Sequence, residues 1–247
     1  MMTEKDAPVA LVTGGAKRIG RAICQDLAAH GWRVAIHCRA SRDEAEELAG
    51  EIVRNGGEAA VVAGDLSDMA SVESLLPQAR QALGPVSLLV NNAALFLPDT
   101  PSTLEAEVWD RQFAVNLRAP LFLARAFAAE RGEDDEGLIV NMIDQRVLRP
   151  TGDMASYTLA KSALWTATQT LAQALAPNIR VNAIGPGPTL PNPHDGEEGF
   201  EREVQATLLK RSVFLADFGR TIRYLWETRS VTGQLIALDS GQHLVRG

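Results

Sequence analysis

Two residues of this sequence, Tyr157 and Lys161, stand at a spacing that suits proton transfer. They lie four positions apart in a segment of helical spacing from Met154 to Ala176, so we expect them to share one helix face. A lysine charge beside a phenol lowers the phenol pKa from its usual value of about 10. A tyrosine tuned in this way can act as a general acid. The same spacing often occurs by chance, so the place of the pair in the fold has to show whether it is catalytic.

The segments around this pair alternate between short apolar runs and helical spacing. Strands are predicted at 9–12, 34–36, 59–62, 86–90, 138–142, 179–184 and 235–238. Helices are predicted at 18–30, 42–55, 68–83, 104–130, 154–176 and 213–227. The alternation predicts an α/β fold, a doubly wound parallel sheet with helices on both faces, in a single domain over residues 1–247. Tyr157 then opens a helix at the carboxyl edge of the sheet, where such folds bind ligands.

A glycine-rich turn from Thr13 to Gly20 follows the first predicted strand. Glycines let the backbone approach a phosphate, and the N-terminus of the next helix offers free N–H groups. Lys17 and Arg18 oppose the helix dipole at this end, which favours a bound phosphate as their partner. The alternative is a purely structural turn. The residues expected to contact the cofactor here are Gly14, Lys17, Arg18, Ile19 and Gly20.

The end of the second predicted strand indicates which dinucleotide binds. A site that prefers NAD carries an acidic residue about 20 positions after the first glycine, to bind the ribose 2′-OH. At the end of this strand, residues 36–42 contain no acidic residue, and the first one is Asp43. Arg39 and Ser41, with His37 or Arg42, could instead hold a 2′-phosphate. The sequence therefore predicts NADPH as the cofactor, with a solvated turn as the alternative.

Two further strand ends carry polar side chains. Asp65, followed by Leu66, could accept a hydrogen bond from the adenine amine or merely cap the next turn. Asn91 and Asn92 could tie neighbouring strand ends through their amides, and the small Ala93 leaves room for a flat ligand. We therefore expect Asp65, Leu66, Asn91 and Ala93 near the cofactor.

Composition narrows the classes of function. The 247 residues carry a net charge of −7, which argues against nucleic-acid or anionic-membrane partners. No apolar run approaches the roughly 18 residues of a membrane span. The first residues lack an apolar signal-peptide core, and the two cysteines are too few for a disulfide framework. A cytoplasmic protein without a metal site is the prediction.

Several motifs together resemble the short-chain dehydrogenase/reductase family over nearly the whole chain. They are TGGAKRIG at 13–20, DL at 65–66, NNAA at 91–94, Asn116, YTLAK at 157–161 and GPGPT at 185–189. The resemblance implies a Rossmann-type sheet of seven strands, a nicotinamide cofactor and hydride transfer. It implies that Lys161 holds the nicotinamide ribose and that Asn116 organises a water beside the lysine. It also places Pro186, Gly187 and Thr189 against the cofactor.

Asp144 departs from the family pattern, which usually has a serine thirteen positions before the tyrosine. That serine donates a hydrogen bond to the substrate oxygen, whereas an ionised carboxylate can only accept one. Asp144 suits a substrate that presents N–H groups, such as an aminopyrimidine ring, and could help relay a proton to a ring nitrogen. A structural acid is the alternative. Asp144, Arg18 and Phe96 resemble the pteridine reductase branch, in which an aromatic residue here stacks on the pterin. Phe96 could equally anchor a buried loop.

The sequence thus predicts an NADPH-dependent reductase of a pterin-like C=N bond, converting dihydropterin to tetrahydropterin, with dihydrofolate as a further candidate. Arg18, Phe96, Asp144 and Tyr157 are the expected substrate contacts, and Tyr157 with Asp144 supplies the proton. One alternative is a carbonyl reductase of the same family, acting on an oxoacyl, sugar or quinone substrate. Another is a non-catalytic NADP(H)-binding regulator.

Two features of the chain bear on substrate access and assembly. The stretch around 188–212 is predicted to be a substrate loop, either a closing lid or a surface loop. The predicted helices 104–130 and 154–176 carry more apolar positions than one sheet face needs. That excess suits an intersubunit bundle, and the family resemblance implies a homotetramer.

Overall fold

Within the described residues, seven strands form one sheet, and every neighbouring pair is parallel. The structure is a computed structural model that describes residues 7–132, 135–192 and 196–245. The strands are β1 (Val9–Val12), β2 (Arg33–Cys38), β3 (Glu58–Ala63), β4 (Val86–Asn91), β5 (Gly137–Met142), β6 (Ile179–Pro186) and β7 (Leu235–Leu238). Their order, β3-β2-β1-β4-β5-β6-β7, is doubly wound and reverses between β1 and β4. The predicted Rossmann-type fold is confirmed.

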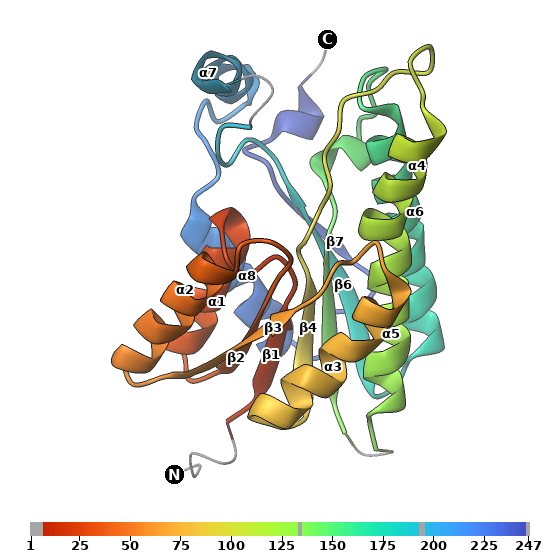
Figure 1. The fold of residues 1–247 in the computed structure, drawn as a ribbon. Helices are drawn as coiled ribbons and strands as arrows, with labels where there is room; N and C mark the ends of the chain where they lie inside the picture. Colours follow the sequence, from red (N-terminus) through yellow and green to blue (C-terminus); the bar gives the residue numbers. More distant parts are fainter. Residues whose placement is uncertain (1–6, 133–134, 193–195, 246–247) are drawn as a thin grey trace.

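Helices cover both faces of the sheet (Figure 1). One face packs against α1 (Arg18–Ala29), α2 (Arg42–Arg54) and α8 (Leu215–Glu227). The other packs against α3 (Met69–Leu83), α5 (Ala119–Ala129) and part of α6 (Ala155–Ala174). No helix in the described ranges combines the length and the apolar character that crossing a membrane requires.

The central strands explain why the apolar runs of the sequence are continuous. Every residue of β1 and of β5 is buried, because helices cover both faces of the sheet. Parallel strands in this position end on one common edge, and the loops that leave that edge carry the candidate site residues.

The helix predicted at 104–130 is present without a break over 106–129, but its middle departs from α-helical geometry. It consists of α4 (Ala106–Phe113), a π-helical turn η2 (Ala114–Arg118) and α5. Pro120 has no N–H and cannot bond the carbonyl of Asn116, which removes one α-helical hydrogen bond at this point. Single π turns inside helices are often found at functional sites, and this one carries Asn116.

The predicted substrate loop around 188–212 contains a helix of its own. It is α7 (Gly196–Ala206), which stands over the carboxyl edge of the sheet beside the C-terminal turn η4 (Gln242–Leu244) (Figure 1). Residues 193–195 of this stretch lie outside the described residues. The described part of this stretch therefore contains regular structure that its Pro- and Gly-rich sequence does not indicate.

Candidate active site

The glycine-rich turn between β1 and α1 is closely packed. Gly14 has φ +62°, and Arg18 has φ +53°, the left-handed region that normally favours glycine. A Cβ on Gly20 would lie 2.1 Å from the carbonyl oxygen of Gly14, so only glycine fits there. Asn92 directly follows β4, the neighbour of β1 in the sheet. It holds the turn in place, because its Nδ2 donates to the carbonyl oxygen of Thr13 at 2.8 Å. The turn is thus fixed before any ligand binds.

His37 holds this turn in place through both of its ring nitrogens. It is buried, its Nδ1 accepts the Gly14 N–H at 3.0 Å, and its Nε2 donates to the Gly64 carbonyl oxygen at 3.0 Å. Burial lowers the pKa of His37, so the ring is neutral. Since both ring nitrogens are engaged within the protein, the expectation that His37 contacts a phosphate is wrong.

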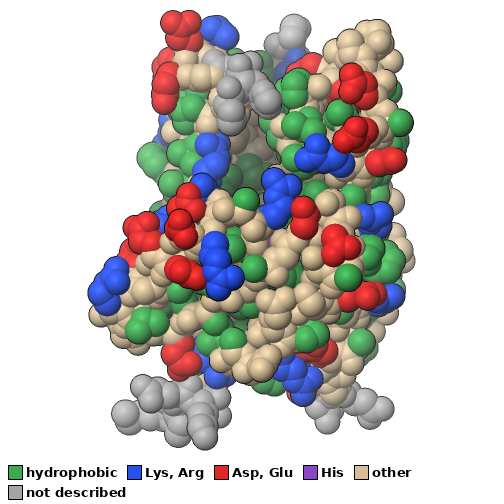
Figure 2. Space-filling view, in the orientation of Figure 1, with side chains coloured by type: hydrophobic (Ala, Val, Ile, Leu, Met, Phe, Trp, Pro, Cys, Tyr) green, Lys and Arg blue, Asp and Glu red, His purple; other side chains and the backbone are tan. Residues whose placement is uncertain are grey.

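Two adjoining cavities lie along the carboxyl edge of the sheet. The larger has a volume of about 510 Å³, the smaller about 280 Å³, and both are lined by Gly14, Lys17 and Ala93. In the space-filling view a hollow opens here, with Lys and Arg side chains around its rim (Figure 2). Two adjoining cavities of this size suit a dinucleotide, which has two halves, with a substrate beside one of them.

The cavities bring together nearly all residues that the sequence singled out. The larger is lined by Gly14, Lys17, Arg18, Ile19, Gly20, Ala93, Phe96, Asp144, Tyr157, Lys161, Pro186, Gly187 and Thr189. The smaller is lined by Gly14, Lys17, His37, Arg39, Ser41, Asp65, Leu66 and Ala93. Asn91 and Asn116, both described, line neither. Asn91 instead ties β4 to β5, donating to Oδ1 of Asn141 at 2.8 Å, as expected for an amide at a strand end.

The start of α1 and the cations near it fit an anionic ligand. Among the described side chains none caps this helix, its first turn holds no acidic residue, and its first residues Arg18, Ile19 and Gly20 line the larger cavity. Lys17 pairs with Glu44 at 2.5 Å. The Arg18 guanidinium donates to the carbonyl oxygens of Pro191 at 2.9 Å and Leu190 at 3.3 Å. Arg18 therefore links the turn to the predicted substrate loop, a contact that the sequence did not indicate.

Asp65 follows the second of its two predicted roles and also lines the smaller cavity. Its Oδ1 accepts hydrogen bonds from the Ser67 N–H at 2.8 Å and the Ser67 hydroxyl at 2.7 Å. These bonds lower the pKa of Asp65, which keeps it ionised. Arg39 lies 3.9 Å away, so this end of the cavity presents an acid and a cation together.

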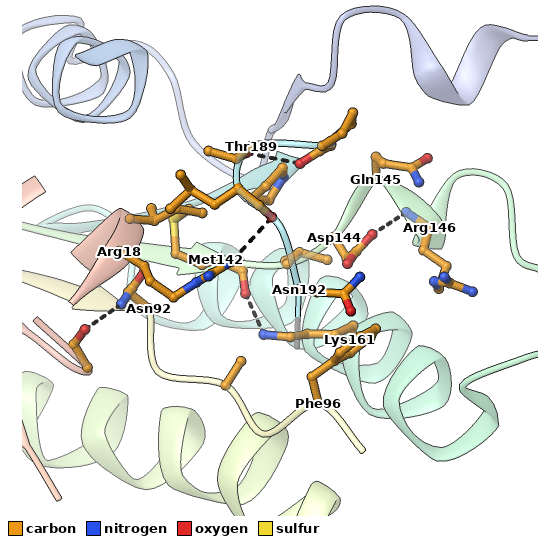
Figure 3. A pocket seen from close by; sticks show the side chains of 18 of the residues that line it. Arg18, Asn92, Phe96, Met142, Asp144, Gln145, Arg146, Lys161, Thr189 and Asn192 are labelled. Carbon is orange, nitrogen blue, oxygen red and sulfur yellow. Dashed lines mark hydrogen bonds between the residues drawn. The ribbon is translucent and has the colours of Figure 1, made fainter. Parts of the chain in front are cut away.

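Tyr157, Asp144 and Lys161 meet at the floor of the larger cavity. The Tyr157 hydroxyl donates to Asp144 Oδ2 at 3.1 Å, and Lys161 Nζ donates to the Met142 carbonyl oxygen at 2.7 Å. Figure 3 shows the second bond, with Asp144 and Phe96 nearby. The Phe96 ring meets the Tyr157 ring edge to face, with 4.7 Å between centroids. Three segments supply these groups: Asp144 follows the end of β5, Tyr157 and Lys161 lie in the first turns of α6, and Phe96 lies in the loop after β4.

Burial sets the electrostatics of these three groups. It raises the pKa of Asp144, against the lowering effect of the Arg146 N–H and charge. It raises the pKa of Tyr157 well above its usual value, and the Asp144 charge adds to this rise. The pKa of Lys161 falls to about 8. The expectation that Lys161 lowers the Tyr157 pKa is therefore wrong here, because burial and Asp144 dominate. Tyr157 is held in its proton-donating form.

Several residues of the larger cavity were not predicted from sequence. Gln145 and Arg146 follow β5 directly, and the Arg146 N–H donates to Asp144 Oδ1 at 2.8 Å (Figure 3). Their position just after a strand end was the available signal. Glu203 and Gln242 line the cavity from α7 and the C-terminal turn. Glu203 falls within the predicted substrate loop around 188–212, although it was not singled out there, and nothing in the local sequence marks Gln242.

The family follows from comparison with known proteins. A family model described as short chain dehydrogenase matches residues 8–198. The chain belongs to the short-chain dehydrogenase/reductase family, a family of oxidoreductases, and the resemblance seen in the sequence is confirmed.

Within that family the chain is similar to pteridine reductases. Pteridine reductase 1 of Leishmania tarentolae is 32% identical over 290 residues, covering 100% of both chains. The crystal structure of FolM alternative dihydrofolate reductase 1 from Brucella suis in complex with NADP is 54% identical, covers 99% of this chain and 98% of that chain, and has a TM-score of 0.95. The granaticin polyketide synthase putative ketoacyl reductase 2 of Streptomyces violaceoruber is 29% identical over 248 residues, covering 97% of this chain and 98% of that protein. The predicted nicotinamide cofactor agrees with the NADP complex.

The depressed pKa of Lys161 predicts a pH dependence of stability. Between about pH 8 and the usual lysine value of 10.5, the unfolded chain binds a proton that the folded chain does not. The free energy of unfolding should therefore gain about 3 kcal/mol from this residue as the pH rises through that window. Denaturant unfolding of wild type and Lys161→Met between pH 7 and 10 measures it. The same slope in both proteins would contradict the assignment.

Proposed function

We propose that this chain uses NADPH to reduce a C=N bond of a pterin-like substrate, dihydropterin to tetrahydropterin, with dihydrofolate as a second candidate. One observation carries the proposal. The half-buried carboxylate of Asp144 accepts a hydrogen bond from the hydroxyl of the general-acid candidate Tyr157 at 3.1 Å. A carboxylate at this place repels a ketone oxygen but accepts N–H groups, which a pterin ring supplies.

The residues present fit an NADPH molecule. The open N-terminus of α1, with Lys17 and Arg18, would hold the pyrophosphate, and Arg39 with Ser41 would hold the 2′-phosphate. Lys161 would bind the nicotinamide ribose. Ile19, Pro186, Gly187 and Thr189 would line the nicotinamide end, with Asp65 and Leu66 at the adenine end. When bound, the cofactor supplies the hydride.

Proton delivery falls to the chain's own side chains. Tyr157 keeps its proton because its pKa is raised, so it is a donor throughout the neutral range. Asp144 orients that hydroxyl, accepts substrate N–H groups and, with its own pKa raised, can exchange a proton with a ring nitrogen. Lys161 stands 5.7 Å from the Tyr157 ring centroid, where its charge stabilises the phenolate left after transfer.

Two further residues would bind the substrate. Phe96 borders the cavity beside Tyr157 and would cover one face of the flat ring. Arg18 lines the same cavity and would reach the pterin carbonyl oxygen. The names of the relatives, a pteridine reductase and an alternative dihydrofolate reductase, support the same substrate class.

Reduction of a carbonyl compound is the second candidate, and the ketoacyl reductase among the relatives favours it. Asp144 opposes it, since an acid takes the place of the usual serine donor. A regulator that only binds NADP(H) would not need Tyr157 bonded to Asp144 in a cavity.

A substrate panel with Asp144 variants tests the proposed reaction. With NADPH, the wild type should reduce dihydropterin, while simple ketones react poorly. Asp144→Ser should lower kcat/KM for dihydropterin by about a hundredfold or more, in line with loss of a key transition-state contact. Asp144→Asn keeps the shape and removes the charge, so it separates charge from packing. Turnover of ketones alone by the wild type would refute the proposal.

The NADPH preference is tested by two arginine variants. Arg39→Ala should raise KM for NADPH by about tenfold, as expected for a lost charge-assisted phosphate contact, and leave KM for NADH nearly unchanged. Arg42→Ala is the matched control, because its guanidinium points at Glu46, 2.8 Å away on the surface of α2. Equal effects of Arg39→Ala on both cofactors would show that Arg39 does not bind the 2′-phosphate.

We further propose that the chain forms a homotetramer. Trp109 and Phe113 stack at 4.3 Å on α4, half-buried Phe122 and Trp165 lie on the neighbouring helices, and Leu159 is 50% exposed. Apolar rings in these positions suit a bundle of helices between subunits. Light scattering should give about four times the chain mass of 26.6 kDa. A monomeric mass would contradict this proposal.

A further inference from the structure

Two side-chain amides clamp the loop that carries Phe96. Asn116 accepts the Leu95 N–H at 2.9 Å and donates to the Leu95 carbonyl oxygen at 2.8 Å. Gln112 accepts the Leu97 N–H at 3.3 Å and donates to the Leu97 carbonyl oxygen at 3.2 Å. Phe96 therefore lies between Leu95 and Leu97, and the backbone N–H and carbonyl oxygen of both residues are hydrogen-bonded by these side-chain amides.

Gln112 also reaches the helix that carries Tyr157. Its Nε2 donates to Ser156 Oγ at 2.6 Å, and Ser156 immediately precedes Tyr157. The Ser156 hydroxyl and N–H in turn donate to the Asp99 carboxylate. Gln112 and Ser156 are fully buried, and Asp99 is 6% exposed. A buried network in which each member is bonded tolerates little displacement.

The chemistry of this position requires a neutral amide. The carbonyl oxygen of Gln112 accepts one bond, while its NH₂ group donates two, to Leu97 and to Ser156. A carboxylate could donate neither bond and would place a second negative charge beside Asp99. An apolar side chain would remove the side-chain partner of the Leu97 N–H and carbonyl oxygen and one bond to Ser156, whose hydroxyl would keep only Asp99.

We propose that Gln112 is a positioning residue that sets Phe96 and Tyr157 relative to one another. The two rings meet edge to face at 4.7 Å, although their segments are far apart in the sequence. Gln112 bonds a residue next to each ring in the sequence, Leu97 beside Phe96 and Ser156 beside Tyr157, and so fixes the position of the substrate-facing ring relative to the proton donor. The inference rests on the proposed function in that Phe96 forms the substrate wall.

The chain offers a matched control on another helix. Gln78 on α3 accepts the Ala63 N–H at 3.3 Å and donates to the Ala63 carbonyl oxygen at 3.4 Å. It also donates to Ser74 Oγ at 2.9 Å. The same set of bonds is therefore made away from Phe96 and Tyr157. Replacing Gln78 by Met removes equivalent bonds without disturbing the two rings.

The test compares Gln112→Met with Gln78→Met. Gln112→Met should lower kcat/KM for the pterin by about tenfold to a hundredfold, as expected when reacting groups shift by a fraction of an ångström to an ångström. The pH profile of kcat/KM should also shift, since the Tyr157 environment changes. Its Kd for NADPH should stay within about twofold of wild type. Gln78→Met should leave both kcat/KM and this Kd within about twofold of wild type, with the pH profile unchanged. A loss no larger in Gln112→Met than in Gln78→Met would overturn the inference.

A second variant covers the case in which Gln112→Met does not fold. Ser156→Ala removes the bond from Gln112 to α6 together with the hydroxyl bond to Asp99, while the Ser156 N–H still bonds Asp99 and Gln112 still bonds Leu97. It should lower kcat and shift the pH profile while KM for the substrate changes little. Unchanged kcat and pH profile in Ser156→Ala would refute the role of the link.

The outcome is separable from that of the proposed function. If the wild type reduces no pterin, the proposed function fails. The variants are then compared on whichever carbonyl substrate the wild type reduces. A selective loss in Gln112→Met there still supports the positioning role, and equal rates in both glutamine variants overturn it.

Discussion

The hydrogen bond from Tyr157 to Asp144 is the interaction on which the rest of the site depends. Tyr157 is buried, so its hydroxyl needs a partner, and the half-buried Asp144 supplies one. The bond keeps the tyrosine protonated and gives the carboxylate a defined orientation. It also decides which substrate atoms the cavity accepts, because a carboxylate beside a phenol favours N–H groups over a carbonyl oxygen.

That bond can form only if the end of β5 and the start of α6 are held in place. The Arg146 N–H fixes the other oxygen of Asp144, and Lys161 bonds the carbonyl oxygen of Met142 at the end of the same strand. On the helix side, Ser156 is bonded by Asp99 and Gln112. Side-chain amides and hydroxyls recur here because each can satisfy backbone donors and acceptors at once.

Much of the fold could be predicted from sequence for a simple physical reason. Strands buried on both faces are continuous apolar runs, and β1 and β5 follow that rule at every position. The glycine-rich turn was also visible, and Arg18 in the left-handed region occupies a place where related turns carry glycine. The Tyr157 and Lys161 pair followed from helical spacing together with its predicted place at the carboxyl edge of the sheet.

What the sequence could not show depends on tertiary packing. The inward orientation of His37 follows from its burial beneath the turn, and the raised pKa of Tyr157 follows from burial beside Asp144. The role of Gln112 requires Leu97 and Ser156 to be neighbours, which no local pattern reveals. The π turn before Pro120 had a visible cause, but its position within the helix did not follow from it.

The most direct test of the central claim is a crystal structure of the ternary complex with NADP⁺ and a pterin. The account predicts that the Asp144 carboxylate accepts hydrogen bonds from pterin N–H groups, with the ring between Phe96 and the nicotinamide and the Tyr157 hydroxyl facing a ring nitrogen. A pterin bound away from Asp144, or with its carbonyl oxygen directed at Tyr157 as a ketone would be, would contradict the account.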